Sequence, residues 1–476
     1  MIVVYVILAA LAGLIAVLFI NTAIKCACAR KLQGPMPEFT EEELDMYGKT
    51  LQEMIQCKTV SVKDSYDDTE FAKLRGVVEQ RFPMLHTKAE RMILAKDCWL
   101  YKIPGKNPDR SILLMSHHDV VPANEEWTYE PFSGTIVDGK IYGRGTADTK
   151  GSLCSIMFAV EQLLAEDFQP EVNVFVGSSY NEELGGDGAT SMLAYFKEHG
   201  IQLEVILDEG GAIVDPPLGN MNCKKCAMVA VHEKGRCKIK CTATTQSSHV
   251  SLTGYANNPV ERMSCFIRDV SDGKLFIRSL NPMVTGMFSS LAPYCAFPMN
   301  VLFCNLWLFG GIIKKVLPKI NSTAGGMVGT TIAFQTIEGS MNGKVCTSTA
   351  MLRNVSETDL EKDLDALREV AKKYGIEIEI TYQEYYAPAD MSSDAFAYAV
   401  KCVHEVYPQY PAAPYILPAG TDAWKLTPVC NCVLRFAPNR MSSKQLASIH
   451  AVDENMDISA IAEGAAYYKH FVTNYK

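Results

Sequence analysis

The stretch SILLMSHHD, residues 111 to 119, joins an apolar run to two histidines and an aspartate. A short continuous apolar run is typical of a parallel strand that is buried on both faces of its sheet. Two more such runs occur at 172 to 177 and 203 to 207, and the segment 151 to 166 has a helical pattern. This alternation predicts crossover connections, and therefore an α/β fold with a mostly parallel sheet.

Each predicted strand is followed by side chains that bind divalent ions or move protons. Ligands collect outside the carboxyl ends of parallel strands, so these side chains should meet at one edge of the sheet. The set, with two members from other loops, is His117, Asp119, Asp148, Glu182, Glu183, Asp208 and His450. Imidazoles and carboxylates without thiolate favour zinc, manganese or cobalt, and a shared carboxylate can hold two ions roughly 3.5–4 Å apart. The residues therefore indicate a two-metal hydrolase centre.

Two positions in this set need a choice between neighbours. Adjacent glutamates cannot both point the same way, so if Glu183 faces a metal, Glu182 is free to act as general base. The H-x-D spacing favours His117 over His118. Taken singly, Asp148 could be a turn residue and the glutamates a helix start. The metal interpretation therefore rests on the whole set.

Five motifs occur in the order and at about the spacing of the M20 metallopeptidase family. They are HHDVVP (117–122), GRGTADTKG (143–151), NEELGG (181–186), LDEGG (207–211) and IHAVDE (449–454). The resemblance runs from about residue 36 to the end of the chain. EKG at 233–235, the segment 297 to 313 and GTDAWK at 420–425 resemble the branch that holds carboxypeptidase S and the N-fatty-acyl-amino acid hydrolases.

The resemblance implies two metal sites that share one ligand. One divalent ion would be bound by His117, Asp148 and Asp208. The other would be bound by Asp148, Glu183 and His450, so that Asp148 is the bridge. Zinc is favoured, with cobalt or manganese as alternatives, and hydroxide on the metal would be the nucleophile.

The resemblance also implies roles for the residues around the ions. Asp119 would orient His117 through its other ring nitrogen, and Glu182 would be the general base. Glu209 directly follows Asp208 and could replace it as ligand; Asp208 is preferred.

Substrate-binding residues are implied where the chain partly departs from the family pattern. Arg353 matches an arginine of the family's lid domain and could bind a carboxylate bidentately. Gly420 begins GTDAWK, in which Trp424 stands where the family has arginine. His249 matches the histidine that stabilises the oxyanion across the family's homodimer.

The implied function is a metal-dependent hydrolase of amide bonds in peptides or N-acyl amino acids. The alternatives are an N-acyl amino acid synthase/hydrolase for long acyl chains and a non-catalytic binding protein. The net charge of −9 without a basic cluster speaks against a nucleic-acid partner, so the expected partner is a small-molecule substrate.

The amino-terminal residues predict a membrane anchor. Residues 2 to 20 carry no charge and are long enough to span a bilayer core. Lys25, Arg30 and Lys31 follow directly, which by the positive-inside rule places the enzyme in the cytoplasm. No basic start or small-residue cleavage site of a signal peptide is evident.

Sixteen cysteines without a compact framework suit a reducing compartment. Cys223, Cys226, Cys237 and Cys241 have a spacing that could hold a structural zinc. The last two also stand in a strand-like stretch, where they would simply be buried.

The chain is predicted to contain a divided catalytic domain. The expected parts are a transmembrane helix (1–24), a linker (25–37), a first catalytic segment (38–231), an inserted α+β lid and dimerisation domain (232–386) and a second catalytic segment (387–476). The apolar segment 297 to 320 is expected either to pack on the lid sheet or to form an acyl-chain wall or membrane-dipping surface.

Overall fold

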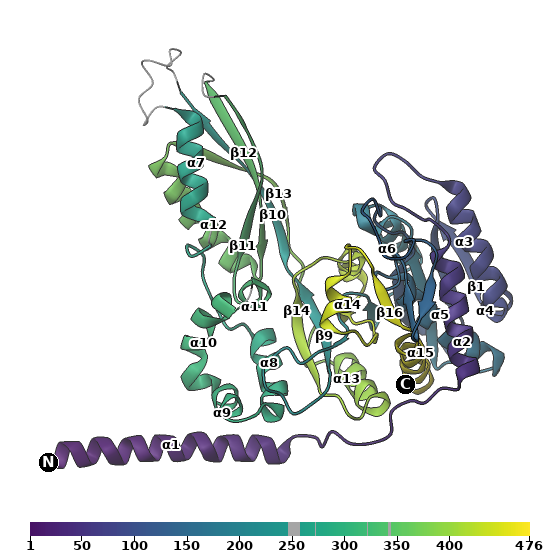
Figure 1. The fold of residues 1–476 in the computed structure, drawn as a ribbon, viewed down its shortest axis with the longest axis horizontal. Helices are drawn as coiled ribbons and strands as arrows, with labels where there is room; N and C mark the ends of the chain where they lie inside the picture. The colour runs from purple at the N-terminus through teal and green to yellow at the C-terminus, as the bar shows by residue number, and fades with distance from the viewer. Residues whose placement is uncertain (246–257, 272, 321, 341–343) are drawn as a thin grey trace.

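The computed structural model describes residues 1–245, 258–271, 273–320, 322–340 and 344–476. Two sheets dominate the fold, and a long amino-terminal helix extends away from both (Figure 1). The larger sheet is mixed, with both parallel and antiparallel pairs, and the smaller sheet is antiparallel throughout.

The larger sheet holds nine strands. In spatial order they are β1 (Glu90–Leu94), β2 (Cys98–Ile103), β6 (Val172–Ser179), β3 (Asn107–His117), β7 (Ile206–Asp208), β15 (Val433–Arg435), β9 (Cys226–Glu233) and β14 (Ala412–Leu417), with β8 (Ile213–Val214) paired to β9. Strands β6, β3, β7 and β15 are parallel to one another, as are β9 and β14. The predicted α/β class with parallel strands at the centre is therefore confirmed.

Strand β3 shows why its sequence is apolar without interruption. Successive side chains of a strand point to opposite faces of the sheet. Ile112 and Leu114 pack into the core on one face, whereas Leu113 and Met115 pack into the core on the other. Burial on both faces requires apolar residues at every position.

Helices cover both faces of this sheet. The helices of the larger core are α2 (Glu41–Ile55), α4 (Pro83–Lys88), α5 (Lys150–Ala165), α13 (Asp394–Val406) and α15 (Ile458–Asn474). Helix α6 (Gly188–Glu198) and the short helix η5 (Asp422–Val429) pack on the opposite face, and α3 (Asp68–Arg81) contributes to both cores. Thr40-Glu-Glu-Glu43 has the sequence form of a capping box, and both of its hydrogen bonds are present at the start of α2.

A three-stranded ribbon ties two distant loops together. Its strands are β4 (Thr135–Val137), β5 (Lys140–Tyr142) and β16 (Asn455–Asp457). Because β16 pairs with β5, the segment just after β5 is held beside the segment just before β16.

The smaller sheet belongs to an inserted domain, residues 235 to 384, that rises from the larger sheet (Figure 1). Its strands are β11 (Thr331–Gly339), β12 (Val345–Asn354), β10 (Gly235–Thr244) and β13 (Ile376–Glu384). Helices α7 (Pro259–Val270) and α12 (Glu357–Lys373) cover one face of it. Only Lys234 separates β10 from β9, so the two sheets are joined by a single residue at this crossing.

Further helices interrupt the inserted domain between α7 and β11. They are α8 (Pro282–Leu291), η4 (Ala292–Tyr294), α9 (Met299–Cys304), α10 (Leu306–Ile320) and α11 (Ser322–Met327). Helix α8 packs against the edge strand β14, and Phe303, Ile313 and Leu317 join the core of the larger sheet. The expectation that this segment packs on the sheet of the inserted domain is therefore wrong, because its apolar face instead completes the core beside β14.

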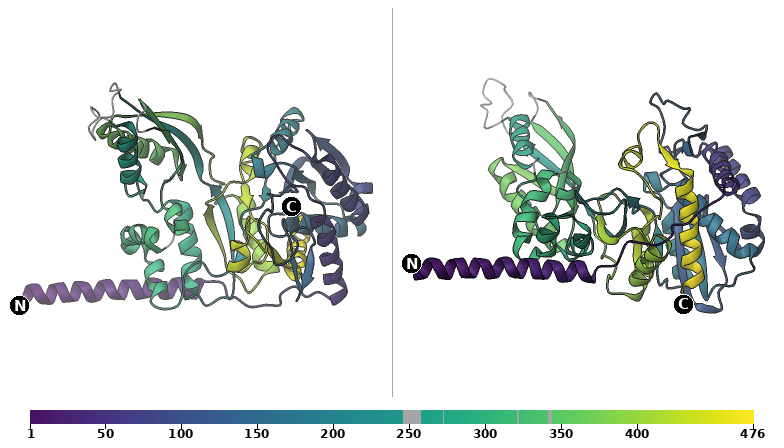
Figure 2. Two further views of the ribbon diagram at one scale, coloured as in Figure 1. Left: turned by 45° about the horizontal axis from the view of Figure 1, so that its top comes forward. Right: turned by 60° about the horizontal axis from the view of Figure 1, so that its bottom comes forward.

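Helix α1 (Ile2–Cys28) is attached to the molecule only near its carboxyl end, as Figure 2 shows from two further directions. Leu18 and Thr22 are its buried residues, and the large apolar residues before Leu18 are exposed except for the half-buried Leu14. The Nδ2 group of Asn21 donates hydrogen bonds to the carbonyl oxygen of Cys304 and to the Oδ1 atom of Asn305.

Candidate metal centre

The predicted ligands come from strand ends and from the loops that the ribbon holds together. His117 ends β3, and Glu183 lies in the short helix η1 (Glu182–Leu184) after β6. Asp148 lies between β5 and α5, and His450 follows α14 (Ser443–Ala447). Pairing of β16 with β5 brings the Asp148 loop and the His450 loop to the same edge of the larger sheet.

One group of three metal-binding side chains is His117, Asp148 and Glu209. The Nε2 atom of His117 lies 3.0 Å from Oδ1 of Asp148 and 3.5 Å from Oε1 of Glu209. His117 is buried, and both carboxylates are mostly buried. The three donors therefore converge from three different segments on one point.

The second group is Asp148, Glu183 and His450. The Nε2 atom of His450 lies 2.9 Å from Oδ2 of Asp148 and 3.1 Å from Oε2 of Glu183. Asp148 thus presents one oxygen to each group, which is the arrangement required of a bridging carboxylate. His450 has a positive φ of 60°, a conformation that is uncommon outside glycine and clusters at functional sites.

Glu209, rather than Asp208, is the acidic residue beside His117. The Oδ2 atom of Asp208 accepts a hydrogen bond of 3.0 Å from the backbone N–H of Ala423. Asp208 is buried at the end of β7, and this bond ties it to η5 instead of the donor groups. The preference for Asp208 over Glu209 therefore does not match the geometry, because side chains of adjacent residues at a strand end point in opposite directions.

Asp119 is buried and connects the histidine to the glutamate pair. Its Oδ1 atom lies 3.3 Å from Nδ1 of His117. Its two oxygens also accept hydrogen bonds of 3.1 Å from the backbone N–H groups of Glu182 and Glu183. The hydroxyl of Ser61 donates a further bond of 2.6 Å to Oδ2. One carboxylate therefore orients both the ring of His117 and the segment that carries Glu182.

Glu454 supports Asp148 in the same way, and sequence reasoning did not assign it a role. Its buried carboxylate accepts hydrogen bonds from the backbone N–H groups of Gly145, Ala147 and Asp148. It also forms an ion pair of 2.7 Å with Arg144. Glu454 is the last residue of the motif IHAVDE, and this position is the feature of the sequence that could have pointed to its supporting role.

The electrostatics of the site favour cations. Burial raises the pKa of Glu209 to about 8, and the charge of Asp148 adds to this rise. Burial likewise raises the pKa of Glu182 well above its ordinary value, although His117 opposes the rise. Hydrogen bonds to Asp148 and Glu183 raise the pKa of His450 to about 10. Crowded acidic groups that repel one another are stabilised by divalent cations.

One buried atom gives a direct test of the fit to a metal. The Oε1 atom of Glu183 is buried and has no hydrogen-bond partner within the described ranges. Burying a carboxylate oxygen without a partner is costly, and coordination of a cation removes that cost. The donor set of imidazole and carboxylate also fits zinc, manganese or cobalt.

Arg353 and Gly420, two of the predicted substrate-binding residues, lie close together. Nη2 of Arg353, on β12, donates hydrogen bonds of 3.1 Å to the carbonyl oxygens of Lys234 and Ala419. Ala419 directly precedes Gly420. Trp424, the third predicted substrate-binding residue, stacks on Tyr386, and the centroids of the two rings are 4.3 Å apart.

The remaining predicted sites are His249 and a group of four cysteines. His249 lies outside the described residues. Sγ of Cys223 and Sγ of Cys226 are 3.6 Å apart, whereas Cys237 and Cys241 point into the core under the smaller sheet. The Cys223 and Cys226 thiols therefore lie apart from those of Cys237 and Cys241, and the four do not form a shared zinc site.

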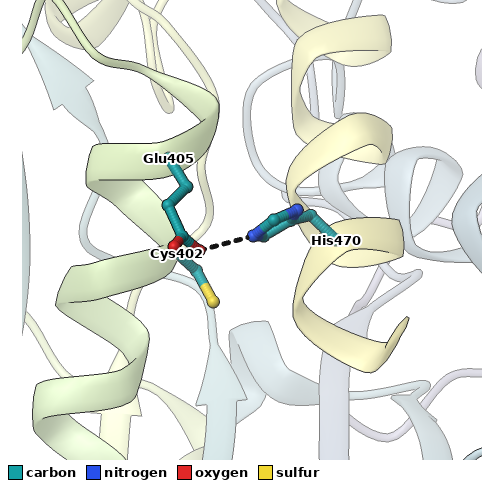
Figure 3. Close-up of side chains that lie close together, drawn as sticks. All are labelled: Cys402, Glu405 and His470. Atoms are coloured by element: carbon teal, nitrogen blue, oxygen red, sulfur yellow. Dashed lines mark hydrogen bonds and ion pairs between the residues drawn. The ribbon is translucent and has the colours of Figure 1, made fainter. Parts of the chain in front are cut away.

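A third group of possible ligands, Cys402, Glu405 and His470, joins α13 to α15 (Figure 3). Nε2 of His470 lies 2.8 Å from Oε2 of Glu405 in a partly exposed ion pair. Burial raises the pKa of the Cys402 thiol to about 12, which disfavours the thiolate form that binds metals. This cluster is accounted for as an ion pair between two helices.

Comparison with known proteins identifies the family. The model of Peptidase family M20/M25/M40 matches residues 113–474. The N-fatty-acyl-amino acid synthase/hydrolase PM20D1 of Xenopus tropicalis is 26% identical over 98% of this chain and 94% of its own length. The probable carboxypeptidase S-like 2 of Dictyostelium discoideum is 30% identical over 88% of this chain and 82% of its own. The M20 family metallo-carboxypeptidase Sso-CP2 of Sulfolobus solfataricus has the same fold, with a TM-score of 0.63 and 18% identity over 91% of this chain and 99% of its own. The chain therefore belongs to the M20/M25/M40 peptidase family and is an amidohydrolase enzyme.

Proposed function

We propose that this enzyme hydrolyses the amide bond of N-acyl amino acids whose acyl group is long and apolar. The observation that carries the proposal is an apolar cavity of about 380 Å³ whose lining includes sequence neighbours of two donor residues. Its volume lies within the roughly 300–1,000 Å³ of typical ligand pockets. Gly210, which follows Glu209, and Leu446, four residues before His450, both line it.

The lining of the cavity fits an acyl chain. Met228, Met287, Phe288, Phe303 and Leu317 contribute apolar side chains, and no charged residue lines it among those that the structure describes. Each methylene of a ligand buried here gains roughly 0.8 kcal/mol. A peptide with charged or polar side chains would gain no such contact.

Arg353 is proposed to bind the carboxylate of the amino acid. Its Nε atom is buried and has no hydrogen-bond partner within the described ranges. Its Nη2 group is held by the carbonyl oxygens of Lys234 and Ala419. A guanidinium fixed in this way is preorganised for a planar carboxylate.

The reaction is proposed to use two divalent ions, with zinc favoured and cobalt or manganese as alternatives. His117, Asp148 and Glu209 would hold one, and Asp148, Glu183 and His450 the other. When bound, such ions activate water and polarise a carbonyl group.

Glu182 is proposed to move the proton. Because Asp119 fixes the backbone of both glutamates, Glu183 can face a donor group while Glu182 faces the reacting water. Glu182 would accept a proton from the water and pass it to the leaving amine. Burial raises the pKa of Glu182 above its ordinary value, which strengthens this carboxylate as a proton acceptor.

A membrane anchor on the cytoplasmic face is also proposed. Helix α1 has 27 residues and so measures about 40 Å, longer than the roughly 30 Å core of a bilayer. A signal sequence would meet the same criterion of length and composition. The hydrogen bonds of Lys25 to Cys304 and of Arg30 to His404 and Pro408 support retention of the helix, because a cleaved leader needs no contact with the folded enzyme.

Dimerisation through the inserted domain completes the proposal, with His249 of each subunit acting in the site of the other. The smaller sheet carries Ile337, Ile380 and Tyr382, which remain exposed. Apolar residues on an open sheet are typical of surfaces that bind another chain.

The decisive experiment compares substrates on the purified full-length enzyme. With one amino acid held constant, kcat/KM should rise as the acyl group lengthens from acetyl to palmitoyl, and dipeptides should be poorer substrates. A Met287→Trp variant, which fills the cavity, should lower long-chain turnover far more than acetyl-amino acid turnover. A preference for dipeptides, with no effect of Met287→Trp on chain length, would contradict the assignment.

A further inference from the structure

The outer face of α10 is apolar although no part of the described chain covers it. Trp307 and Ile312 are each 62% exposed, and Leu308 and Val316 are also exposed. Leu308, Ile312 and Val316 follow one another at intervals of four positions and therefore share one side of the helix, and Trp307 directly precedes Leu308 in the first turn. The opposite side, with Ile313 and Leu317, is buried against the larger core.

This face is continuous with α1. Phe297, which is 69% exposed, lies just before α9 and stacks on Phe19 of α1 with ring centroids 6.4 Å apart. Asn305, the residue before α10, donates hydrogen bonds to the carbonyl oxygen of Leu18 and to Oγ1 of Thr22. The contact between α1 and the start of α10 is therefore built from specific hydrogen bonds.

The position of the contact along α1 sets its depth in a membrane. Residues 2 to 17 cover about 24 Å of helix, less than the roughly 30 Å of hydrocarbon in a bilayer. Phe19 would therefore still lie within the apolar layer, and Phe297 with it. Figure 1 shows α10 on the side of the molecule from which α1 projects.

The charges on α10 fit a membrane surface rather than a protein core. Lys314, Lys315 and Lys319 belong to the helix, and the segment Leu306–Ile320 has no acidic residue, although the whole chain has a net charge of −9. A helix with tryptophan and aliphatic residues on its free face and lysines beside them is typical of binding at the boundary of headgroups and acyl chains.

The cavity reaches the same face. Ile312 and Val316 are exposed to the outside and also line the cavity, so its wall meets the surface at α10. We infer that α10 and Phe297 contact the bilayer beside α1, and that the acyl chain of a substrate enters the cavity from the lipid at this contact. The route of entry rests on the proposed function, whereas the bilayer contact does not.

The test uses Trp307 as its own probe in the full-length enzyme reconstituted in phospholipid nanodiscs. Lipids brominated near the headgroup end of their acyl chains should quench part of the tryptophan fluorescence. Trp307→Phe should remove that quenched part, because Trp99 is buried, Trp424 stacks on Tyr386, and Trp127 lies against Arg144 in the loop between β3 and β4. Failure of the enzyme to enter nanodiscs, absence of quenching, or quenching that persists in Trp307→Phe would overturn the bilayer contact.

A matched control places a tryptophan on another exposed apolar position. Ile93 on β1 is 49% exposed at the far edge of the larger sheet. Ile93→Trp in the Trp307→Phe background should not be quenched by the same lipids. Quenching at both positions would mean a general affinity for lipid and would also overturn the inference.

The entry route has its own readout. A variant with Phe297, Trp307 and Leu308 all changed to serine should lower turnover of a palmitoyl-amino acid embedded in vesicles by about tenfold, while turnover of soluble acetyl-amino acid stays unchanged. Equal turnover of the embedded substrate would overturn the route. Absence of turnover with every substrate in the unmodified enzyme would instead refute the proposed function, and the fluorescence result would stand apart from it.

Discussion

Glu454 and Asp148 are 306 positions apart in the chain, yet Oε1 of Glu454 accepts a hydrogen bond of 3.0 Å from the backbone N–H of Asp148. The same carboxylate pairs with Arg144, and both side chains are buried. Asp148 presents one oxygen to each donor group, so the loop that carries it must be fixed. Glu454 is therefore a positioning residue for the centre rather than a ligand.

Glu454→Gln should weaken metal binding by about 10- to 100-fold, the usual scale for groups that support ligands. The unpaired Arg144 should also lower the free energy of unfolding by about 3–5 kcal/mol. Calorimetric metal titration and thermal unfolding measure the two effects. Asp453→Asn, a neighbouring change that disturbs only bonds to Thr128, is the control. Unchanged metal affinity with lowered stability would show that Glu454 serves folding alone.

Glu182→Gln should keep the metal content and lower turnover by at least about 100-fold, because the general base is lost. Glu183→Gln is the matched variant and should lose metal. Elemental analysis of both proteins, combined with kcat, separates the roles. If Glu182→Gln loses an ion and keeps its rate per metal, the two glutamates have exchanged roles.

Glu209→Gln should lower the metal content by one ion, because Glu209 lies beside His117 and Asp148. Asp208→Asn should retain both ions and mainly destabilise η5, whose Ala423 N–H bonds to Asp208. Metal stoichiometry of the two variants decides the assignment. Loss of an ion in Asp208→Asn alone would restore the ligand preference drawn from the sequence.

The sequence predicted those parts of the fold that short-range patterns determine. The apolar run before His117 predicts a strand buried on both faces, and β3 has that environment. Thr40 and Glu43 predict a capped helix start, and both bonds are present. The side chains of His117, Asp148, Glu183 and His450 converge as expected, because strand ends and the β5–β16 pairing share one edge.

The parts that sequence reasoning missed depend on contacts between distant residues. Whether Asp208 or Glu209 faces His117 depends on the direction of the last residue of β7, which the motif alone does not give. The role of Glu454 in holding the Asp148 loop follows only from its hydrogen bond to Asp148, which lies 306 positions earlier in the chain. The apolar residues of α10 form a helix pattern with several possible partners. Only the fold places Ile313 and Leu317 in the larger core and Asn305, just before the helix, against α1.

The topology of α1 predicts protection from external protease. In intact cells, protease added outside should not cleave the catalytic domain if the proposed cytoplasmic orientation, which rests on Lys25, Arg30 and Lys31, holds. Deletion of residues 1 to 31 should release the enzyme from membranes. Immunoblotting of an epitope at the carboxyl terminus measures both effects, with lysed cells as the control. External cleavage, or a mature form without α1, would refute the orientation.

His249→Ala should lower kcat by about 100- to 1,000-fold, the scale for loss of one oxyanion donor, while metal content stays unchanged. If His249 acts in the partner's site, one subunit with His249→Ala and another with Glu182→Gln together contain one complete site. Mixing the two inactive variants should therefore restore activity at one site per mixed dimer. Activity of the mixture is compared with that of each parent, and subunit exchange is followed by mass spectrometry of differently tagged chains. If exchange occurs and the mixture stays as inactive as its parents, His249 does not act across a dimer, and the proposed role of the inserted domain in catalysis fails.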